Sequence, residues 1–467
     1  MTLIESMRNR EEVLWINPKE AAVAPGEKVK GYGFVHVKAA QNRFMRFLPY
    51  IAAAFPETAR RKGVIESQLI EIPKMKDWLN AQGAGIEGRL YLKDDARLPI
   101  AGSVKARGGI HEVLKIAETL ALESGKLVPG EKYDKLYSEE FKAFFGQYKI
   151  QVGSTGNLGI SIGRMSARMG FHTIVHMSCD AKQWKKDLLR SVGVDGREYE
   201  GNYSEAVAAG RRASDADPCS FFVDDEKSED LFFGYATAAM RLKVQLFKAD
   251  IEVDKDHPLF LYLPCGVGGA PGGITFGMKQ LFGPYVHCFF AEPVDAPCMT
   301  LGMVSGKREQ IAVQDIGLSG KTRADGLAVS RASVLACSLM ETLMAGAYTV
   351  KDEHMDQYRD KLEELEQIHL ELSACAGFHG AAQICKNGKV NADSVVGELA
   401  CGEKVRDEKV CGEKGYVEKG CCERVCSGQN ESSPSTWQSY LEEHDLKDKM
   451  AQATHIVWGT GGGLEPR

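Results

Sequence analysis

The sequence predicts an α/β fold with largely parallel sheets, because strand-like runs alternate with helical patterns from about residue 88 onward. Five short runs are bounded by turn residues and rich in β-branched or aromatic side chains, as buried strands are. They are residues 89–93, 172–178, 258–263, 287–291 and 455–458. Between them, residues 110–120 carry apolar side chains at helical spacing. Such alternation is typical of a parallel sheet covered by helices on both faces. The residues before about 80 are expected to be helical and connecting.

Length, composition and charge narrow the class of protein. The chain has 467 residues, 44% hydrophobic and 26% charged, which is the usual mix of a soluble globular protein. At about 150 residues per domain, two or three domains are expected. No apolar run approaches the roughly 18 residues of a membrane helix, and the first residues resemble no secretory signal. A net charge of −6 gives no electrostatic reason to bind nucleic acid or anionic membrane. We therefore expect a soluble, cytoplasmic protein.

Ligands of open α/β sheets bind where strands lead into helix N-termini, and four turns of the sequence have that position. The first, LPIAGSVKARGG at residues 98–109, places Lys105 at the start of a helix. The positive end of a helix favours the neutral amine, which is the form that attacks carbonyl groups. The alternative is an ordinary surface lysine on a first helical turn.

The second turn, VGSTGNLG at residues 152–159, offers backbone N–H groups and polar side chains to an anionic ligand. Its polar side chains belong to Ser154, Thr155 and Asn157. An ordinary capped helix start would look similar.

The third turn, PCGVGGAPGG at residues 264–273, is a glycine-rich loop of the kind that binds a phosphate through backbone N–H groups. It is not a dinucleotide fingerprint, because Pro271 stands where the last glycine should be. The fourth turn, HIVWGTGGG at residues 455–463, carries Thr460; a flexible glycine tail is its alternative. A lysine, a phosphate loop, a carboxylate site and a lone hydroxyl together favour pyridoxal 5′-phosphate (PLP) over a nucleotide.

Several motifs resemble one family in the same order along the chain. PIAGSVKARGGIHEVL, VGSTGNLGISIG, LPCGVGGAPGGITFG, HCFFAEP, ADGLAVSRAS and the final TGGG resemble the bacterial-type D-serine dehydratases. That family belongs to the fold-type II, tryptophan-synthase-β-like PLP enzymes. The resemblance implies two open, mostly parallel sheet domains with the cofactor in the cleft between them. It implies a large domain of residues 1–148 and 229–467 and a small, substrate-closing domain of residues 149–228.

The resemblance assigns a role to each turn. Lys105 binds the PLP aldehyde covalently, Asn157 hydrogen-bonds the phenolic oxygen of the ring, and Thr460 faces the pyridine nitrogen. The substrate carboxylate is held by Ser154, Thr155 and Gly156. The phosphate is held by Gly266, Val267, Gly268, Gly269 and Ala270, where relatives usually have glycine at the last position.

The implied activity is elimination of D-serine to pyruvate and ammonia, with D-threonine converted to 2-oxobutanoate as a secondary activity. A D-substrate turns its Cα–H toward the ring face opposite to that of an L-substrate, so Thr155 is a candidate base there. Asp225 is a candidate for orienting the substrate or assisting, although Asp224 and Asp225 could simply cap a loop. Glu292 could contribute to a monovalent cation (K⁺) site, or form a salt bridge at the edge of the core. No other metal site is expected.

Two alternative activities stay open on sequence alone. One is an L-serine or L-threonine dehydratase, or a serine racemase, of the same fold. The other is a catalytically silent PLP-binding regulator, which would not need to keep Lys105, Asn157 and Thr460 together. The family is typically monomeric, so a monomer is expected, with a dimer as the alternative.

The cysteines are unevenly distributed. None of the 13 precedes Cys179, and five lie in a charged stretch with a ten-residue repeat (CGEK, CGEK, CCER). We expect residues 386–434 to be a disordered surface insertion, because the stretch has too few apolar side chains to form a core. The remaining cysteines are expected to be reduced, with Cys265 packed beside the phosphate loop.

Overall fold

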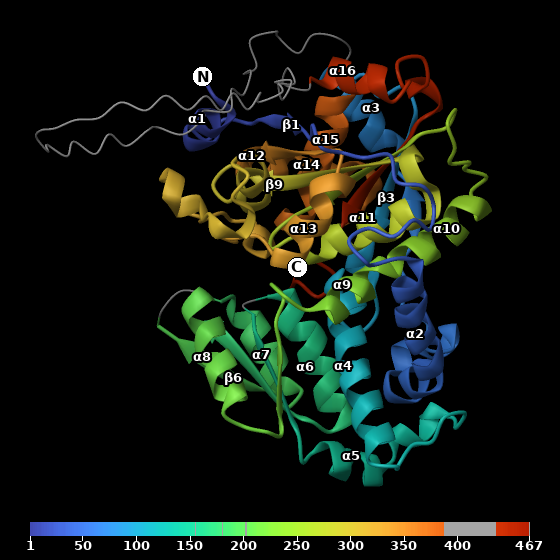
Figure 1. The fold of residues 1–467 in the computed structure, drawn as a ribbon, viewed down its shortest axis with the longest axis vertical. Coiled ribbons are helices and arrows are strands. Elements are labelled where there is room, and N and C mark those ends of the chain that lie inside the picture. Colours follow the sequence, from blue (N-terminus) through green and yellow to red (C-terminus); the bar gives the residue numbers. More distant parts are fainter. Residues whose placement is uncertain (155, 180, 201–202, 387–435, 467) are drawn as a thin grey trace, which may run out of the picture.

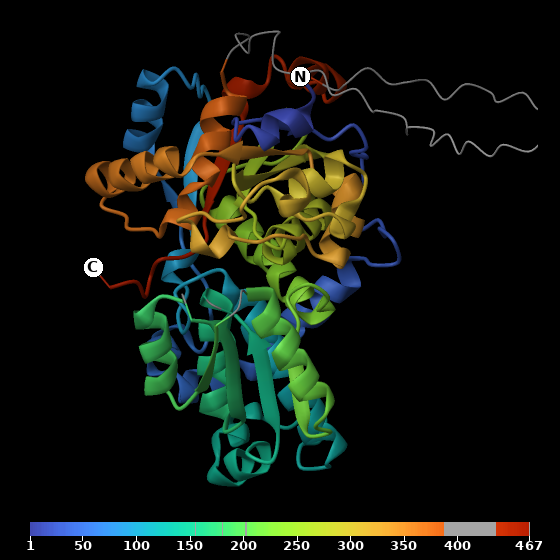
Figure 2. The ribbon, with the colours of Figure 1, turned by 90° about the vertical axis from the view of Figure 1, so that its left-hand side faces the viewer.

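The computed structural model describes residues 1–154, 156–179, 181–200, 203–386 and 436–466. Its two sheets lie in two lobes, one above the other in Figure 1 and in the turned view of Figure 2. The larger sheet has the strand order β1-β10-β9-β8-β11-β3-β2 and the smaller sheet the order β6-β5-β4-β7.

The strands of the larger sheet are β1 (Leu14–Ile16), β2 (Leu69–Glu71), β3 (Arg89–Asp94), β8 (Leu259–Pro264), β9 (Val286–Pro293), β10 (Gly346–Val350) and β11 (Thr454–Gly459). Those of the smaller sheet are β4 (Lys149–Gly153), β5 (His172–Ser178), β6 (Asp195–Tyr199) and β7 (Ser220–Val223). All strand pairs in the smaller sheet are parallel. In the larger sheet only the edge strands β1 and β2 pair antiparallel with their neighbours. The predicted α/β fold with mostly parallel sheets is confirmed.

The helices of the upper lobe in Figure 1 are α1 (Leu3–Arg8), α3 (Pro73–Ala81), α9 (Glu229–Ala236), α10 (Ala238–Lys248), α11 (Gly269–Phe282), α12 (Cys298–Val304), α13 (Val334–Leu343), α14 (Asp352–Glu366), α15 (Gly377–Ile384) and α16 (Trp437–Glu443). The lower lobe holds α2 (Phe34–Ala54), α4 (Lys105–Glu123), α5 (Glu139–Phe145), α6 (Asn157–Met169), α7 (Gln183–Ser191) and α8 (Tyr203–Asp215). Helix α9 lies where the two lobes meet. No helix in the described ranges combines the length and the apolar character that crossing a bilayer requires.

The central strand β8 explains why its sequence, LFLYLP, is apolar without interruption. All six residues are buried, and successive side chains enter two different apolar clusters. Leu261 joins the cluster on one face of the sheet, and Tyr262 joins the cluster on the other. A parallel strand covered on both faces has no polar side, so the two-residue periodicity of a half-exposed strand is lost.

The five strand-like runs of the sequence all form strands, and the predicted helix at 110–120 lies within α4. One expectation was wrong: the residues before 80 are not only helical and connecting, since they supply both edge strands, β1 and β2. These strands have three residues each, too few to produce a recognisable pattern. Apart from Lys386, the predicted insertion at 386–434 lies outside the described residues.

Candidate active site

Two of the predicted turns meet although they are far apart in the sequence. The backbone N–H of Val104 donates to the carbonyl oxygen of Thr460 over 2.7 Å. Next to this bond, Ser103 and Gly461 form an antiparallel bridge. The segment after β11 therefore lies directly against the start of α4, where Lys105 is the first helical residue.

The Lys105 side chain is half-buried and forms no ion pair with any described residue. Its Nζ lies 5.5 Å from the centre of the Tyr235 ring, and within the described residues it has no hydrogen bond or ion pair. Burial lowers the pKa of Lys105, while Asp225, Cys265 and Glu371 oppose the shift. The neutral amine expected from the sequence is thus favoured, but burial rather than the helix end is the main cause.

The glycines of the KARGG motif allow close packing around this lysine. A Cβ on Gly108 would lie 2.4 Å from the Tyr235 ring, and one on Gly109 would lie 2.7 Å from the Ser161 hydroxyl. Ser161 in turn donates to the carbonyl oxygen of Lys105 over 2.8 Å. Both glycines are therefore needed for α4 to approach α9 and α6.

Asn157, the first residue of α6, meets an acid that the sequence did not single out. Its Nδ2 donates to Oε1 of Glu371 over 2.8 Å. Burial raises the pKa of Glu371 to about 7, and the charge of Lys185 opposes the shift. A Cβ on Gly461 would lie 2.1 Å from the same Glu371 oxygen, so this glycine of the TGGG motif leaves room for the contact.

The predicted carboxylate-binding turn is only partly described. The Ser154 hydroxyl accepts the N–H groups of Gly156 (3.1 Å) and Gly159 (3.0 Å), so it caps the start of α6. Thr155 lies outside the described residues. A cation stands beside the turn: a Cβ built on Gly156 would lie 3.6 Å from Nζ of Lys185.

The predicted phosphate loop leads from β8 into α11. Gly268 has φ +103°, and a Cβ there would lie 2.3 Å from the Met299 side chain, so both backbone and space require glycine. The loop is fixed by the N–H of Ser333, which donates to the Val267 carbonyl over 2.7 Å. It ends at the N-terminus of α11, where unpaired N–H groups favour an anion.

The remaining residues of the glycine-rich loop differ in how closely other atoms approach them. A Cβ on Gly266 would lie 2.9 Å from the Gly326 carbonyl oxygen, and Ala270 is buried. Gly269 has more room, since a Cβ there would have its nearest neighbour at 3.7 Å, the carbonyl oxygen of Asp225. Cys265 is buried as expected, and burial raises the pKa of its thiol well above the ordinary value.

The neighbouring residues Asp224 and Asp225 have different surroundings. Asp224 accepts Arg211 over 2.7 Å and the backbone N–H of Glu226 over 3.1 Å, as a loop cap does. Asp225 instead lies close enough to Lys105 and Tyr235 for its charge to raise the pKa of both. The site thus includes Asp225 next to the candidate nucleophile.

Glu292 is a helix cap and does not form the salt bridge considered from the sequence. Its carboxylate accepts the backbone N–H groups of Met299 and Thr300, each over 2.8 Å, and the Thr300 hydroxyl over 2.5 Å. Among the described residues it has no ion pair. Burial raises its pKa to about 7, although the Thr300 hydroxyl and the two N–H groups oppose the shift.

These residues fit a small aldehyde that carries a phosphate. Lys105 supplies an amine with a lowered pKa, and the loop before α11 supplies a phosphate site. The Ser103 hydroxyl, two residues before the lysine, is buried without a partner among the described residues. A buried hydroxyl without a hydrogen bond is costly, so a polar ligand atom beside it would be stabilising. PLP has the required aldehyde, ring oxygen and phosphate.

Comparison with known proteins defines the class. The family model described as pyridoxal-phosphate dependent enzyme matches residues 62–402. The chain belongs to this family, and the fold-type II resemblance predicted from the motifs is confirmed.

Individual proteins of known name are also similar to this chain. A protein of Bacillus mycoides (strain KBAB4) named probable D-serine dehydratase is 48% identical over 465 residues, which is 99% of this chain and 94% of the relative. Among solved structures, Escherichia coli diaminopropionate ammonia lyase in complex with D-serine is 16% identical, with a TM-score of 0.65, covering 97% of this chain and 95% of that one. Serine racemase from Dictyostelium discoideum is 14% identical with a TM-score of 0.56, covering 96% and 100%. The two solved structures share the fold.

Sequence reasoning missed three residues of the site: Tyr235, Glu371 and Lys185. Each lies far along the chain from the turn it contacts, and none belongs to a glycine-rich motif. The contact of Glu371 with Asn157 spans 214 residues. The motif ADGLAVSRAS lies near one of the missed residues, because its Asp325 pairs with Lys185 over 2.8 Å.

Proposed function

We propose that the chain is a PLP-dependent lyase that eliminates D-serine to pyruvate and ammonia, with D-threonine converted to 2-oxobutanoate. The observation that carries the proposal is Lys105, an amine with a lowered pKa that lies near enough to Cys265, at the glycine-rich loop, and to Glu371, which binds Asn157, for both to act on its pKa. The 48% identity with a probable D-serine dehydratase supports the choice of substrate.

PLP, when bound, supplies an electron-withdrawing ring that makes loss of the substrate α-proton feasible. Lys105 would hold it through the aldehyde, Asn157 at the phenolic oxygen, and the loop from Gly266 to Ala270 at the phosphate. The uncharged hydroxyl of Thr460 would stand at the pyridine nitrogen, where it leaves that nitrogen without a proton. Such a ring is a weaker electron sink, which suits a reaction in which the electrons leave at once with the β-hydroxyl.

Ser154, Thr155 and Gly156 would receive the substrate carboxylate. Because the Ser154 hydroxyl already accepts two N–H groups, its contribution is to hold the turn in shape and to donate its own proton. Lys185, buried beside Gly156 and paired with Asp325, adds positive charge near the anionic end of the substrate.

Removal of the α-proton is assigned to Thr155, with Asp225 assisting through its position near Lys105. A Thr155→Val enzyme is expected to lose turnover while still binding PLP. Near-normal turnover would exclude the threonine as base, and loss in Asp225→Asn with retained turnover in Thr155→Val would transfer the role to the aspartate.

The remaining features stay predictions for this chain. We propose that the lower lobe, which holds residues 149–228 together with α2, α4 and α5, closes over the substrate, with PLP between the two lobes. Ion pairs from Lys182 to Glu465 (3.0 Å) and from Lys185 to Asp325 cross from α7 and the residue before it to the upper lobe, which supports contact on closure. A monomeric state, a cytoplasmic location and a K⁺ ion near Glu292 are predicted alongside.

The deciding experiment is pyruvate formation by the PLP-loaded protein from D-serine and, in parallel, from L-serine. The proposal expects product from D-serine and little from L-serine. Product from L-serine alone would indicate an L-serine or L-threonine dehydratase, and interconversion of the two enantiomers would indicate a racemase. PLP absorption without any turnover would indicate the silent, cofactor-binding alternative.

A further inference from the structure

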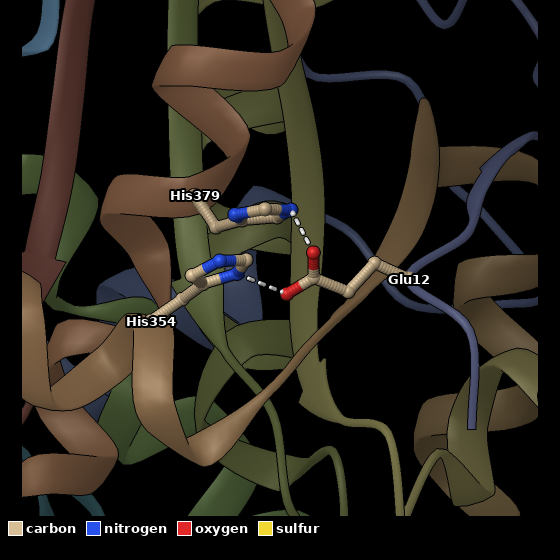
Figure 3. Close-up of side chains that lie close together, drawn as sticks. All are labelled: Glu12, His354 and His379. Carbon is tan, nitrogen blue, oxygen red and sulfur yellow. Dashed lines mark hydrogen bonds and ion pairs between the residues drawn. The ribbon is translucent and has the colours of Figure 1, made fainter. Parts of the chain in front are cut away.

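Three potential metal ligands from separate segments meet at one edge of the larger sheet (Figure 3). Glu12 precedes β1, His354 lies on α14 and His379 lies on α15. All three are half-buried, and their ligand atoms lie within 4.8 Å of one another. The group adjoins β10, two strands away from β8, and includes no residue of the four cofactor turns.

The two oxygens of Glu12 face one histidine each. Oε1 accepts a hydrogen bond from Nδ1 of His354 over 2.6 Å, and a bound metal ion would displace this proton. Oε2 lies 3.7 Å from Nε2 of His379. The second distance is too long for a hydrogen bond. It is close to the roughly 3.3–3.5 Å that separates two ligands of one tetrahedral Zn²⁺. The His354 and His379 rings lie nearly parallel, at 14° and 5.6 Å between centres, so both nitrogens face the carboxylate from the same side.

Neighbouring groups orient two of the three ligands. The Tyr358 hydroxyl lies 3.0 Å from Nδ1 of His379. With the proton on Nδ1 donated to this hydroxyl, the lone pair of Nε2 is left facing Glu12. The backbone N–H of Lys351 donates to Oε1 of Glu12 over 2.8 Å and fixes the carboxylate. Partners of this kind are what metal-binding imidazoles and carboxylates usually have.

We propose that Glu12, His354 and His379 bind one divalent transition-metal ion of the Zn²⁺ type, with water as the fourth ligand. Two imidazole nitrogens and one carboxylate oxygen are a donor set suited to Zn²⁺. The ion has no part in the elimination. It joins the segment before the edge strand β1 to α14 and α15, so its expected effect is on stability.

A second cluster of similar composition serves as the comparison. Glu252, Asp254 and His257 lie within one turn, and Oδ1 of Asp254 already accepts the N–H groups of Asp256 (2.9 Å) and His257 (3.0 Å). The ring Nδ1 of His257 lies 2.9 Å from the same oxygen. This second cluster lies within a single turn and joins no separate segments, so His257→Asn is a matched control.

The test uses untagged, PLP-loaded full-length protein, treated with EDTA, dialysed and titrated with Zn²⁺ by calorimetry. Wild type is expected to bind one more equivalent than Glu12→Gln and His379→Asn, or to bind it at least about tenfold more tightly. His257→Asn is expected to match wild type. Because every variant keeps all cysteines, binding by thiols cancels in the comparison.

Two further measurements keep the result interpretable. Pyruvate formation from D-serine shows that each variant is folded, and it is expected to be unchanged. Zn²⁺ is expected to raise the Tm of wild type and His257→Asn but not of the two ligand variants. Equal Zn²⁺ stoichiometry, equal affinity and equal Tm shifts in wild type, Glu12→Gln and His379→Asn would overturn the proposal.

Discussion

Two buried cations lie two residues apart on α4 and have opposite surroundings. Lys105 has no counter-ion among the described residues, and burial lowers its pKa. Arg107 donates to Asp95 through two bonds of 2.8 Å and to Glu66 over 2.7 Å. Burial alone would lower the pKa of Arg107, but Asp95 and Glu66 raise it.

The neighbouring acids repeat the contrast. Burial raises the pKa of Glu371, near Lys105, to about 7. Burial would also raise that of Glu66, but Arg107 and Lys93 bring it down to about 2. Two residues of α4 thus separate an environment that suppresses charge from a network that stabilises it. A reactive amine needs the first environment, and a helix held rigidly in place is served by the second.

The strongest test of the contrast is removal of the unpaired amine. Lys105→Ala is expected to lower kcat for pyruvate formation by at least about 10³-fold, because it removes the amine that would hold the PLP aldehyde. Lys115→Ala, further along α4 and paired with Asp230, is the control and is expected to stay near wild type. A Lys105→Ala enzyme within about tenfold of wild type would remove the lysine from the mechanism.

Breaking the charged network is expected to act on stability. Arg107→Met leaves the buried Asp95 without an ion pair and Glu66 with Lys93 alone, which should cost ~3–5 kcal/mol in urea unfolding. Arg89→Met removes a similar two-bond pair with Glu71 that is exposed, so it should cost at most ~1 kcal/mol. Equal effects would mean that burial of the pair does not matter.

The free energy of unfolding, measured as a function of pH, tests the raised pKa of Glu371. Its folded pKa of about 7 exceeds the ordinary 4.5, so between these values the folded protein holds a proton that the unfolded chain releases. Its stabilising contribution is therefore present below pH 4.5 and is lost as the pH rises to 7. In cofactor-free protein, Glu371→Gln should gain ~1–3 kcal/mol over wild type from pH 4.5 to 7.5. The exposed Glu364→Gln should run parallel to wild type; a parallel Glu371→Gln would refute the assignment.

The smallest expected effect concerns the hydrogen bond that holds the start of α4. Ser161→Ala removes the donor to the carbonyl oxygen of Lys105 and should lower the free energy of unfolding by ~0.5–1.5 kcal/mol. Ser191→Ala removes a comparable bond to Leu188 in an exposed position and should cost less. Denaturant midpoints at constant m-value distinguish the two.

The sequence predicted the parts of the site that depend on local pattern. Apolar runs identified five strands, and glycine-rich turns pointed to Lys105, Asn157 and the loop at residues 264–273 as candidates, because these features are encoded within about ten consecutive residues. It could not predict Tyr235 above Lys105, Glu371 on Asn157, or the Arg107 network, since each depends on packing between distant segments. Burial, which sets the pKa of Lys105 and of Glu371, is likewise a property of the whole fold.

The position of β11 has a consequence for synthesis of the chain. This strand, Thr454–Gly459, follows the other described strands in sequence and lies between β3 and β8, so the larger sheet stays divided until β11 has left the ribosome. The smaller sheet, made of consecutive segments between Lys149 and Val223, can form long before that. Nascent chains therefore pass through a stage with one finished sheet and one open sheet, and premature termination before β11 yields a protein that also lacks Thr460. Thr460, one of the residues proposed to hold the cofactor, is therefore synthesised only after every described strand of the larger sheet.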